Sequence, residues 1–164
     1  MDLKKLSDQY RDELLNNVLP FWLQNSQDKE FGGYFTCLDR EGKVFDTDKF
    51  IWLQGREVWM FSMLYNKVEK RQEWLDCAVQ GGEFLKKYGH DGNYNWYFSL
   101  DRSGRPLVEP YNIFSYTFAT MAFGQLSLAT GNQEYADIAR KTFDIILSKV
   151  DNPKGKWNKL HPDT

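Results

Sequence analysis

One arginine stands inside a strongly aromatic helical segment of this sequence. The segment runs from Lys49 to Trp59, and within it Trp52 and Arg56 lie four residues apart. On a helix this spacing places both side chains on one face, one turn apart. An arginine on an apolar face is rarely buried without a partner, so Arg56 requires a carboxylate, a wet cavity or a ligand. The motif therefore indicates a polar pocket with aromatic walls, in which a guanidinium could bind the oxygens of a ligand.

Both residues also have a purely structural interpretation. Arg56 could form a salt bridge with a buried carboxylate on another helix, such as a counterpart of Glu57. Trp52 could simply pack in a core, because the sequence is rich in rings, with 6 Trp, 9 Tyr and 12 Phe. We favour a pocket for both, since large rings also line sugar and ligand sites.

The composition limits the function of the chain. Its 164 residues are enough for one domain with a sizeable core. The net charge of -2 comes with no clustered basic excess, so we expect no nucleic-acid partner. The apolar runs are too short to span a bilayer, so we expect no membrane partner. Cys37 and Cys77 are lone thiols behind an N-terminus without a signal-peptide pattern, which favours a cytoplasmic location and predicts no metal site.

Hydrophobic periodicity predicts two kinds of helix. The first kind is amphipathic and is expected at 3–25, where Pro20 should kink the last turn, at 72–88 and at 133–150. The second kind is apolar nearly all round and is expected at 50–67 and 112–129. Amphipathic helices face solvent on one side, whereas helices that are apolar all round are enclosed. The first kind should therefore form an outer layer and the second kind an inner layer.

The sequence also repeats itself at an interval of 61 to 63 residues. Segment 97–105 echoes 34–43, Ile113-Phe114 echoes Ile51-Trp52, and 134–139 echoes 73–78. In the first unit, residues 31–47 carry turn residues and predict a short β-hairpin or an ordered loop between the two helices. Stacked helix pairs bury their inner faces against one another. We therefore predict an all-α fold, an α/α toroid with hairpin or loop insertions between outer and inner helices.

The run from Phe31 to Gly42, followed by that from Trp52 to Met60, resembles the N-acylglucosamine 2-epimerase family, also known as renin-binding protein. Gly81-Gly82-Glu83 and Ile113-Phe114-Ser115 are similar to that family as well, and the similarity covers essentially the whole chain in order. The resemblance implies that residues 1–164 are the N-terminal part of one (α/α)6-barrel catalytic domain. They would supply about five of its twelve helices and end within a repeat unit.

The resemblance implies an isomerase that interconverts N-acetyl-D-glucosamine and N-acetyl-D-mannosamine. The proton on carbon 2 of the open-chain sugar is removed and returned, which needs a base, an acid and a donor to the enolate oxygen. The family uses a histidine pair for these transfers, which we expect beyond residue 164, because His90 and His161 lie on no predicted inner helix. We therefore expect the 164-residue chain alone to be inactive.

The family motif also implies roles for individual residues. Arg56 would be catalytic by holding the substrate oxygens, and Trp52 would line the pocket beside it. Phe114 is the repeat counterpart of Trp52 and should face the same cavity, with Ser115 and Tyr116 next to it at the start of an inner helix. Trp52, Phe114, Ser115 and Tyr116 are therefore predicted to bind substrate.

Tyr34 is a further candidate for substrate binding, because its hairpin could reach over the mouth of the barrel. The alternative is that Tyr34 belongs to the core of the hairpin. Gly81-Gly82 is not a phosphate loop, since it lies within a helix without a flanking strand or lysine, and more plausibly allows close helix packing.

The resemblance implies no required cofactor, and it allows an adenine nucleotide as an activator and a homodimer as the assembly. A small amino sugar is the expected partner. Two other functions stay open. One is a cellobiose 2-epimerase or aldose–ketose isomerase of the same superfamily, and the other is a non-catalytic carbohydrate-binding fragment.

Overall fold

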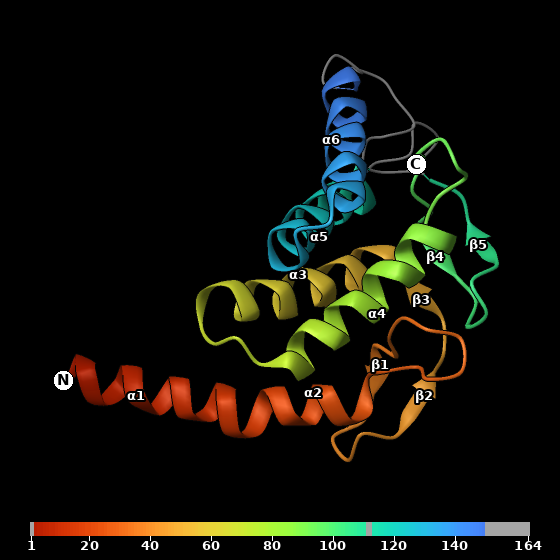
Figure 1. The fold of residues 1–164 in the computed structure, drawn as a ribbon. Helices are drawn as coiled ribbons and strands as arrows, with labels where there is room; N and C mark the ends of the chain where they lie inside the picture. Colours follow the sequence, from red (N-terminus) through yellow and green to blue (C-terminus); the bar gives the residue numbers. More distant parts are fainter. Residues whose placement is uncertain (1, 111–112, 150–164) are drawn as a thin grey trace.

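The computed structural model describes residues 2–110 and 113–149 (Figure 1). Its helices are α1 (Leu3–Glu13), the π-helical segment η1 (Leu14–Val18), α2 (Leu19–Asn25), α3 (Ile51–Lys67), α4 (Gln72–Tyr88), α5 (Phe114–Thr130) and α6 (Gln133–Ser148). Its strands are β1 (Cys37–Leu38), β2 (Val44–Asp46), β3 (Lys49–Phe50), β4 (Ser99–Leu100) and β5 (Pro106–Val108). The predicted helices agree with these bounds to within two residues, and the predicted ends at 112 and 150 lie outside the described residues.

The first predicted helix is divided by a π-helical turn, which was not expected. Pro20 lies in the first turn of α2, directly after the π-helical segment η1. Inside a continuous helix a proline has no N–H to donate, and its ring would clash with the carbonyl group four residues earlier. A widened turn such as η1 immediately before α2 accommodates the ring. Helix α1 extends past the other helices and contains no buried residue (Figure 1). The expected burial of one apolar face is therefore confined to the later turns, where Leu19 is buried.

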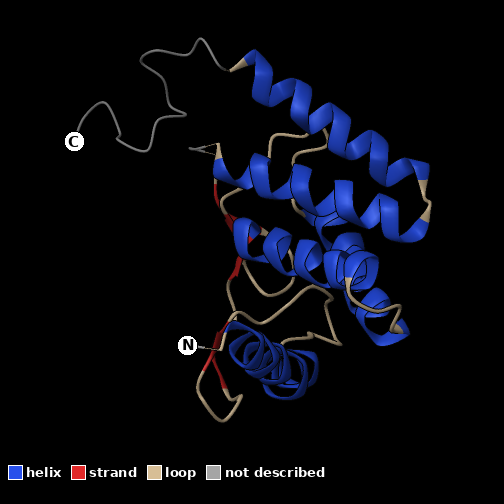
Figure 2. Cartoon of the chain, turned by 90° about the vertical axis from the view of Figure 1, so that its left-hand side faces the viewer, coloured by secondary structure: helices blue, strands red, loops and turns tan. Residues whose placement is uncertain are grey.

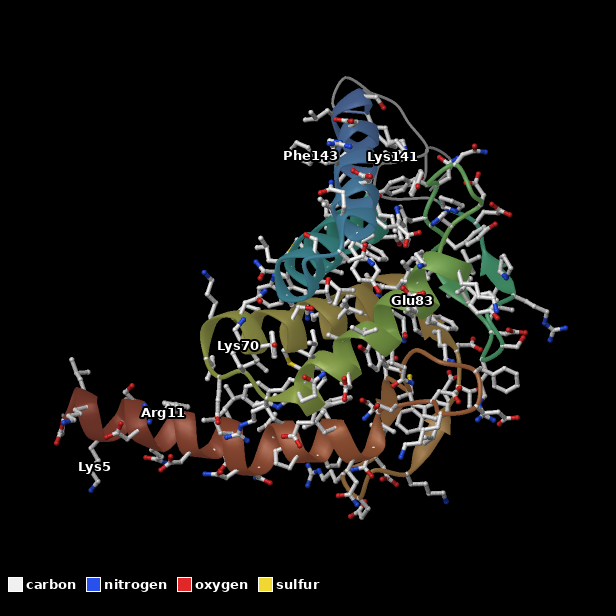
Figure 3. All side chains as sticks on the ribbon, in the orientation of Figure 1. Lys5, Arg11, Lys70, Glu83, Lys141 and Phe143 are labelled. Atoms are coloured by element: carbon white, nitrogen blue, oxygen red, sulfur yellow. The ribbon has the colours of Figure 1, made fainter. Side chains whose placement is uncertain are left out.

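The remaining helices form the two predicted layers. Helix α3 packs most extensively against α5, while α4 packs against α3 and α6 against α5. Side chains of α3 and α5 supply a large part of the buried core: Ile51, Val58, Phe61, Leu64, Tyr116, Ala119, Ala122, Phe123 and Leu126. The outer helices α4 and α6 are joined at Glu83, labelled in Figure 3, which accepts a hydrogen bond of 2.6 Å from the Tyr135 hydroxyl.

The short strands lie together at one end of the helices, on a rim that Figure 2 shows from the side. Strands β1 and β2 form the predicted hairpin, and β4 and β5 form its counterpart in the next unit. Strand β3 also pairs with β4, with Lys49 opposite Leu100 and Phe50 opposite Ser99. This pairing links the two units directly. The sequence did not reveal it, because a strand of two residues has no periodicity.

A fully buried lysine holds this rim together. The Lys49 ammonium donates to the Asp28 carboxylate at 2.9 Å, to the Gly32 carbonyl oxygen at 2.6 Å and to the Arg102 carbonyl oxygen at 2.8 Å. All three of its donors are therefore satisfied. The guanidinium of Arg102 also binds Asp28, through two hydrogen bonds of 3.0 and 3.2 Å. Burial opposes ionisation of Asp28, but the hydrogen bonds from Arg102 and Lys49 outweigh it and hold the pKa of this carboxyl at about 2.

Glycines let the hairpin and the helices approach closely, as predicted for Gly81-Gly82. A Cβ atom on Gly81 would overlap the ring and hydroxyl of Tyr34, and one on Gly82 would overlap Leu126. Gly124, on α5, is different, because a Cβ there would meet no atom within 4 Å.

We predict that Asp28→Asn lowers the free energy of unfolding by about 3–5 kcal/mol, because it leaves a buried ammonium without its counter-charge. Since the pKa of Asp28 is depressed in the folded state, the stability that its ionisation provides is present above pH 4 and is lost as the pH falls towards about 2. Urea unfolding between pH 3 and 7 measures both effects. The control Asp137→Asn breaks an exposed pair with Arg140 and should cost no more than about 0.5 kcal/mol. Equal losses for the two variants would contradict the prediction.

The two helical glycines give a second, opposed pair of substitutions. Gly81→Ala should destabilise the fold by about 1–3 kcal/mol, because Tyr34 must move. Gly124→Ala should be stabilising by about 0.5–1 kcal/mol, because alanine loses less chain entropy in a helix and has room there. Denaturant midpoints of the two variants measure the difference, and a stabilised Gly81→Ala would show that Tyr34 does not pack as described.

Candidate functional site

Arg56 lies between two aromatic rings contributed by different helices. Its guanidinium carbon is 5.3 Å from the centre of the Trp52 ring and 5.0 Å from that of Phe118, and the two ring centres are 6.0 Å apart. These distances allow cation–π contacts with both rings. The predicted shared face of Trp52 and Arg56 is thus observed. Within the part of the chain that the structure describes, Arg56 makes no hydrogen bond or ion pair, so its N–H donors are available to a ligand.

The close contact of α3 with α5 positions this arginine. A Cβ atom on Gly55 would lie 3.0 Å from the backbone carbonyl of Phe118, so the helices can approach this closely only because residue 55 is glycine. Phe118 follows Arg56 by 62 residues and is its counterpart in the repeat. The repeat that pairs Trp52 with Phe114 also pairs Arg56 with Phe118 one turn later, so the sequence contained a signal for Phe118 that was not used.

A cavity of about 270 Å³ adjoins Arg56 on the side of α2. It is lined by Trp22, Thr36, Leu53, Arg56, Glu57 and Met60. Leu53, Arg56 and Met60 recur with helical spacing on α3, so a pattern in the sequence could have identified them. Trp22 and Thr36 come from distant parts of the chain and had no such signal. The Thr36 hydroxyl is buried and has no hydrogen-bond partner among the described residues, so it can bind a polar group that enters the cavity.

Glu57 gives this cavity a buried carboxyl group that the sequence analysis did not identify as part of a site. The residue is only 7% exposed. Burial raises the pKa of its carboxyl to about 8. Burial likewise raises the pKa values of the neighbouring Cys77 thiol and Tyr34 phenol, and a negative charge on Glu57 would raise both further.

Of the six predicted site residues, only Arg56 lines the cavity, while Trp52 contacts its guanidinium without lining the cavity itself. Tyr34 is fully buried against α4, where its hydroxyl donates to the Cys77 carbonyl oxygen at 2.7 Å. Ser115 and Tyr116 are also buried, and the Tyr116 hydroxyl contacts the Asn95 side chain at 3.4 Å. Phe114 is 47% exposed and lies one turn before Phe118 on α5. None of these four residues lines the cavity beside Arg56.

The site combines a cation, a buried acid and a hydroxyl in a largely apolar wall, an arrangement suited to a small molecule rich in oxygen atoms.

The described residues contain no group of three or more His, Cys, Asp or Glu side chains that could hold a metal ion. None of the helices in residues 2–110 and 113–149 is both long and apolar enough to cross a membrane.

Comparison with known proteins assigns the family. The family model described as N-acylglucosamine 2-epimerase (GlcNAc 2-epimerase) matches residues 33–163. N-acylglucosamine 2-epimerase from Mus musculus is 43% identical over 149 residues, which cover 88% of this chain and 36% of the mouse protein. The chain belongs to the N-acylglucosamine 2-epimerase family.

More distant relatives of this epimerase family support the fold. Cellobiose 2-epimerase from Dictyoglomus turgidum is 29% identical, with 96% of this chain and 42% of that protein covered. The solved structure of cellobiose 2-epimerase from Bacillus thermoamylovorans superposes with a TM-score of 0.79 at 28% identity, covering 88% of this chain and 37% of that one. These proteins are α/α barrels, and this chain forms part of such a barrel. It spans about a third of the length of the N-acylglucosamine 2-epimerases it matches.

We predict that Glu57→Gln changes how the stability of the fold depends on pH. Because the pKa of Glu57 is raised in the folded state, the stability that its proton provides is complete below about pH 4.5 and is lost as the pH rises through about 8. Glutamine has no proton to lose, so the variant should gain on the order of 3–5 kcal/mol relative to wild type between pH 5 and 9. Chemical unfolding across this range measures the gain, and parallel curves for the two proteins would contradict it.

Proposed function

We propose that the protein, at its natural length, interconverts N-acetyl-D-glucosamine and N-acetyl-D-mannosamine by moving the proton on carbon 2 of the open-chain sugar. The observation that carries the proposal is the guanidinium of Arg56, held by Trp52 and Phe118 beside a cavity and without an ion-pair partner in the described chain. Support also comes from relatives named N-acylglucosamine 2-epimerase in mouse and human, which are 43% and 44% identical.

The chemistry accounts for the need for such a cation. Opening of the sugar ring exposes an aldehyde, and removal of the proton from carbon 2 moves negative charge onto the aldehyde oxygen. A guanidinium stabilises that oxygen more strongly as its charge develops, and the effect is largest where water is excluded. The planar N–H fork of Arg56 can hold this oxygen and a neighbouring hydroxyl together.

The two proton transfers need groups on opposite faces of carbon 2. His90 is not suited to this work, because it lies in the loop after α4, stacked on Tyr94, and its Nδ1 accepts a hydrogen bond from the backbone of Gly92. His161 lies outside the described residues. We therefore place the histidine pair in the part of the family's length that residues 1–164 do not cover, and we propose that this chain alone is inactive.

The remaining features of the proposal follow from the family and from the composition. They are a small amino sugar as the partner, no required cofactor, a cytoplasmic location and a homodimer. An adenine nucleotide acting as an activator has no binding motif that we can assign to named residues.

Deuterium exchange tests the proposed reaction. The protein is incubated with N-acetyl-D-mannosamine in deuterated water, and carbon 2 of substrate and product is followed by NMR. Deuterium at carbon 2 together with N-acetyl-D-glucosamine is the expected result. No exchange by a folded protein of natural length would contradict the proposal, and faster exchange with cellobiose would favour a disaccharide 2-epimerase instead.

We predict that Arg56→Ala lowers kcat/KM for N-acetyl-D-mannosamine at least about 100-fold, because it removes a donor to the developing oxyanion. Arg56→Lys should recover little, since an ammonium lacks the planar fork. Arg71→Ala is the matched control, because the Arg71 guanidinium also lies over an indole, 4.8 Å from the centre of the Trp74 ring, but on the outer layer. Steady-state kinetics on the three variants would refute the role of Arg56 if its alanine variant stayed within a few-fold of wild type.

A further inference from the structure

The hydroxyl group of Ser26 makes two short contacts but has only one proton. Its oxygen lies 2.7 Å from the Trp22 carbonyl oxygen and 2.5 Å from Oε1 of Glu57. A carbonyl oxygen cannot donate, so the Ser26 proton is needed in the contact with Trp22. The contact with Glu57 is then a hydrogen bond only if the carboxyl group carries a proton and donates it to Ser26. The geometry therefore points to a chain of donors that runs from Glu57 through Ser26 to the carbonyl group of Trp22.

Apart from Arg56, the described residues around Glu57 offer no charge that would favour its ionisation. Ser26 directly follows helix α2, which contains no titratable side chain from Leu19 to Asn25. Helix α4 contributes the Cys77 thiol, and the loop before β1 contributes the Tyr34 phenol, and burial keeps both neutral. On α3 itself, Arg56 is the one neighbouring charge, and it lies beside the same cavity.

Arg56 and Glu57 nevertheless line the same cavity without forming an ion pair. An arginine next to an ionised carboxylate would normally bind it through its N–H fork. Here the guanidinium contacts two rings instead, and the carboxyl group contacts a hydroxyl. Within residues 2–110 and 113–149, the positive charge of Arg56 therefore remains without a counter-charge.

We propose that Glu57 is a positioning residue which, by remaining a neutral acid, leaves the charge of Arg56 free for the oxygen of the sugar substrate. This inference rests on the proposed epimerase function. Ionisation of Glu57 would place a permanent negative charge in the cavity, where it would compete with the substrate oxygen for the same N–H donors. Because the pKa of Glu57 is about 8, this competition would begin just above neutral pH.

The pH profile of kcat/KM tests the inference in the protein at its natural length. Wild type should lose activity above about pH 8, approaching tenfold for each further pH unit if the ionised form is inactive. Glu57→Gln keeps the neutral form at every pH, so its profile, scaled to its own value at pH 6.5, should fall less than about threefold by pH 9.5. Glu83→Gln, on the outer helix α4, is the control and should keep the alkaline decline of wild type.

An infrared measurement gives a readout that does not depend on activity. With isotope-labelled glutamate, the carbonyl stretch of a protonated carboxylic acid should be present at pH 7, should vanish near pH 9.5 and should be missing in Glu57→Gln. An active wild type whose alkaline decline persists in Glu57→Gln, or a spectrum without the acid band at pH 7, would overturn the role of Glu57 alone. A wild type without any epimerase activity would overturn the proposed function and, with it, this role.

Discussion

The buried ammonium group of Lys49 is the contact on which the rim of this fold depends. Its three hydrogen bonds reach Asp28 and Gly32 in the first unit and Arg102 in the second, so one cation fixes loops that are far apart in sequence. Removing a charge from water is costly, and the cost is offset only where every donor is satisfied. The loops are therefore held in a single arrangement, and the strand pairing of β3 with β4 follows directly from the position of Lys49 in β3.

The same rim connects to the candidate site through the start of α3. Strand β3 leads without a break into α3, whose second turn carries Arg56 and Glu57. Gly55 allows α5 to approach that turn, and Phe118 then completes the aromatic environment of the guanidinium. The second repeat unit thus supplies one of the two rings around Arg56, while residues of the first unit line the cavity beside it.

Hydrophobic periodicity and the internal repeat predicted most of the helices. The short strands and the packing of single side chains depend on individual contacts that the sequence pattern does not contain. Helices α3 to α6 follow from periodicity, and the repeat indicated which of them are inner and outer. Arg56 and Trp52 were identified by spacing and by the family motif. Ser115 and Tyr116 were expected beside the pocket as neighbours of Phe114, and Tyr34 because its hairpin could reach over the barrel mouth. All three are buried away from the cavity, because neither a position in a repeat nor a place on a hairpin determines which way a side chain packs. The contact between Ser26, directly after α2, and Glu57 on α3 could not be predicted. It depends on how two segments 31 residues apart in the sequence pack together, and no local sequence pattern indicates it.

The two rings around Arg56 also bear on the entropy of ligand binding. A free arginine side chain explores many rotamers, and fixing it costs about 2 kcal/mol when a ligand must do so. Contacts with Trp52 and Phe118 restrict those rotamers in the unliganded protein, so much of that cost falls on folding and not on recognition. Rings that form no hydrogen bond to a ligand would then strengthen its binding by limiting the motion of the group that can form one.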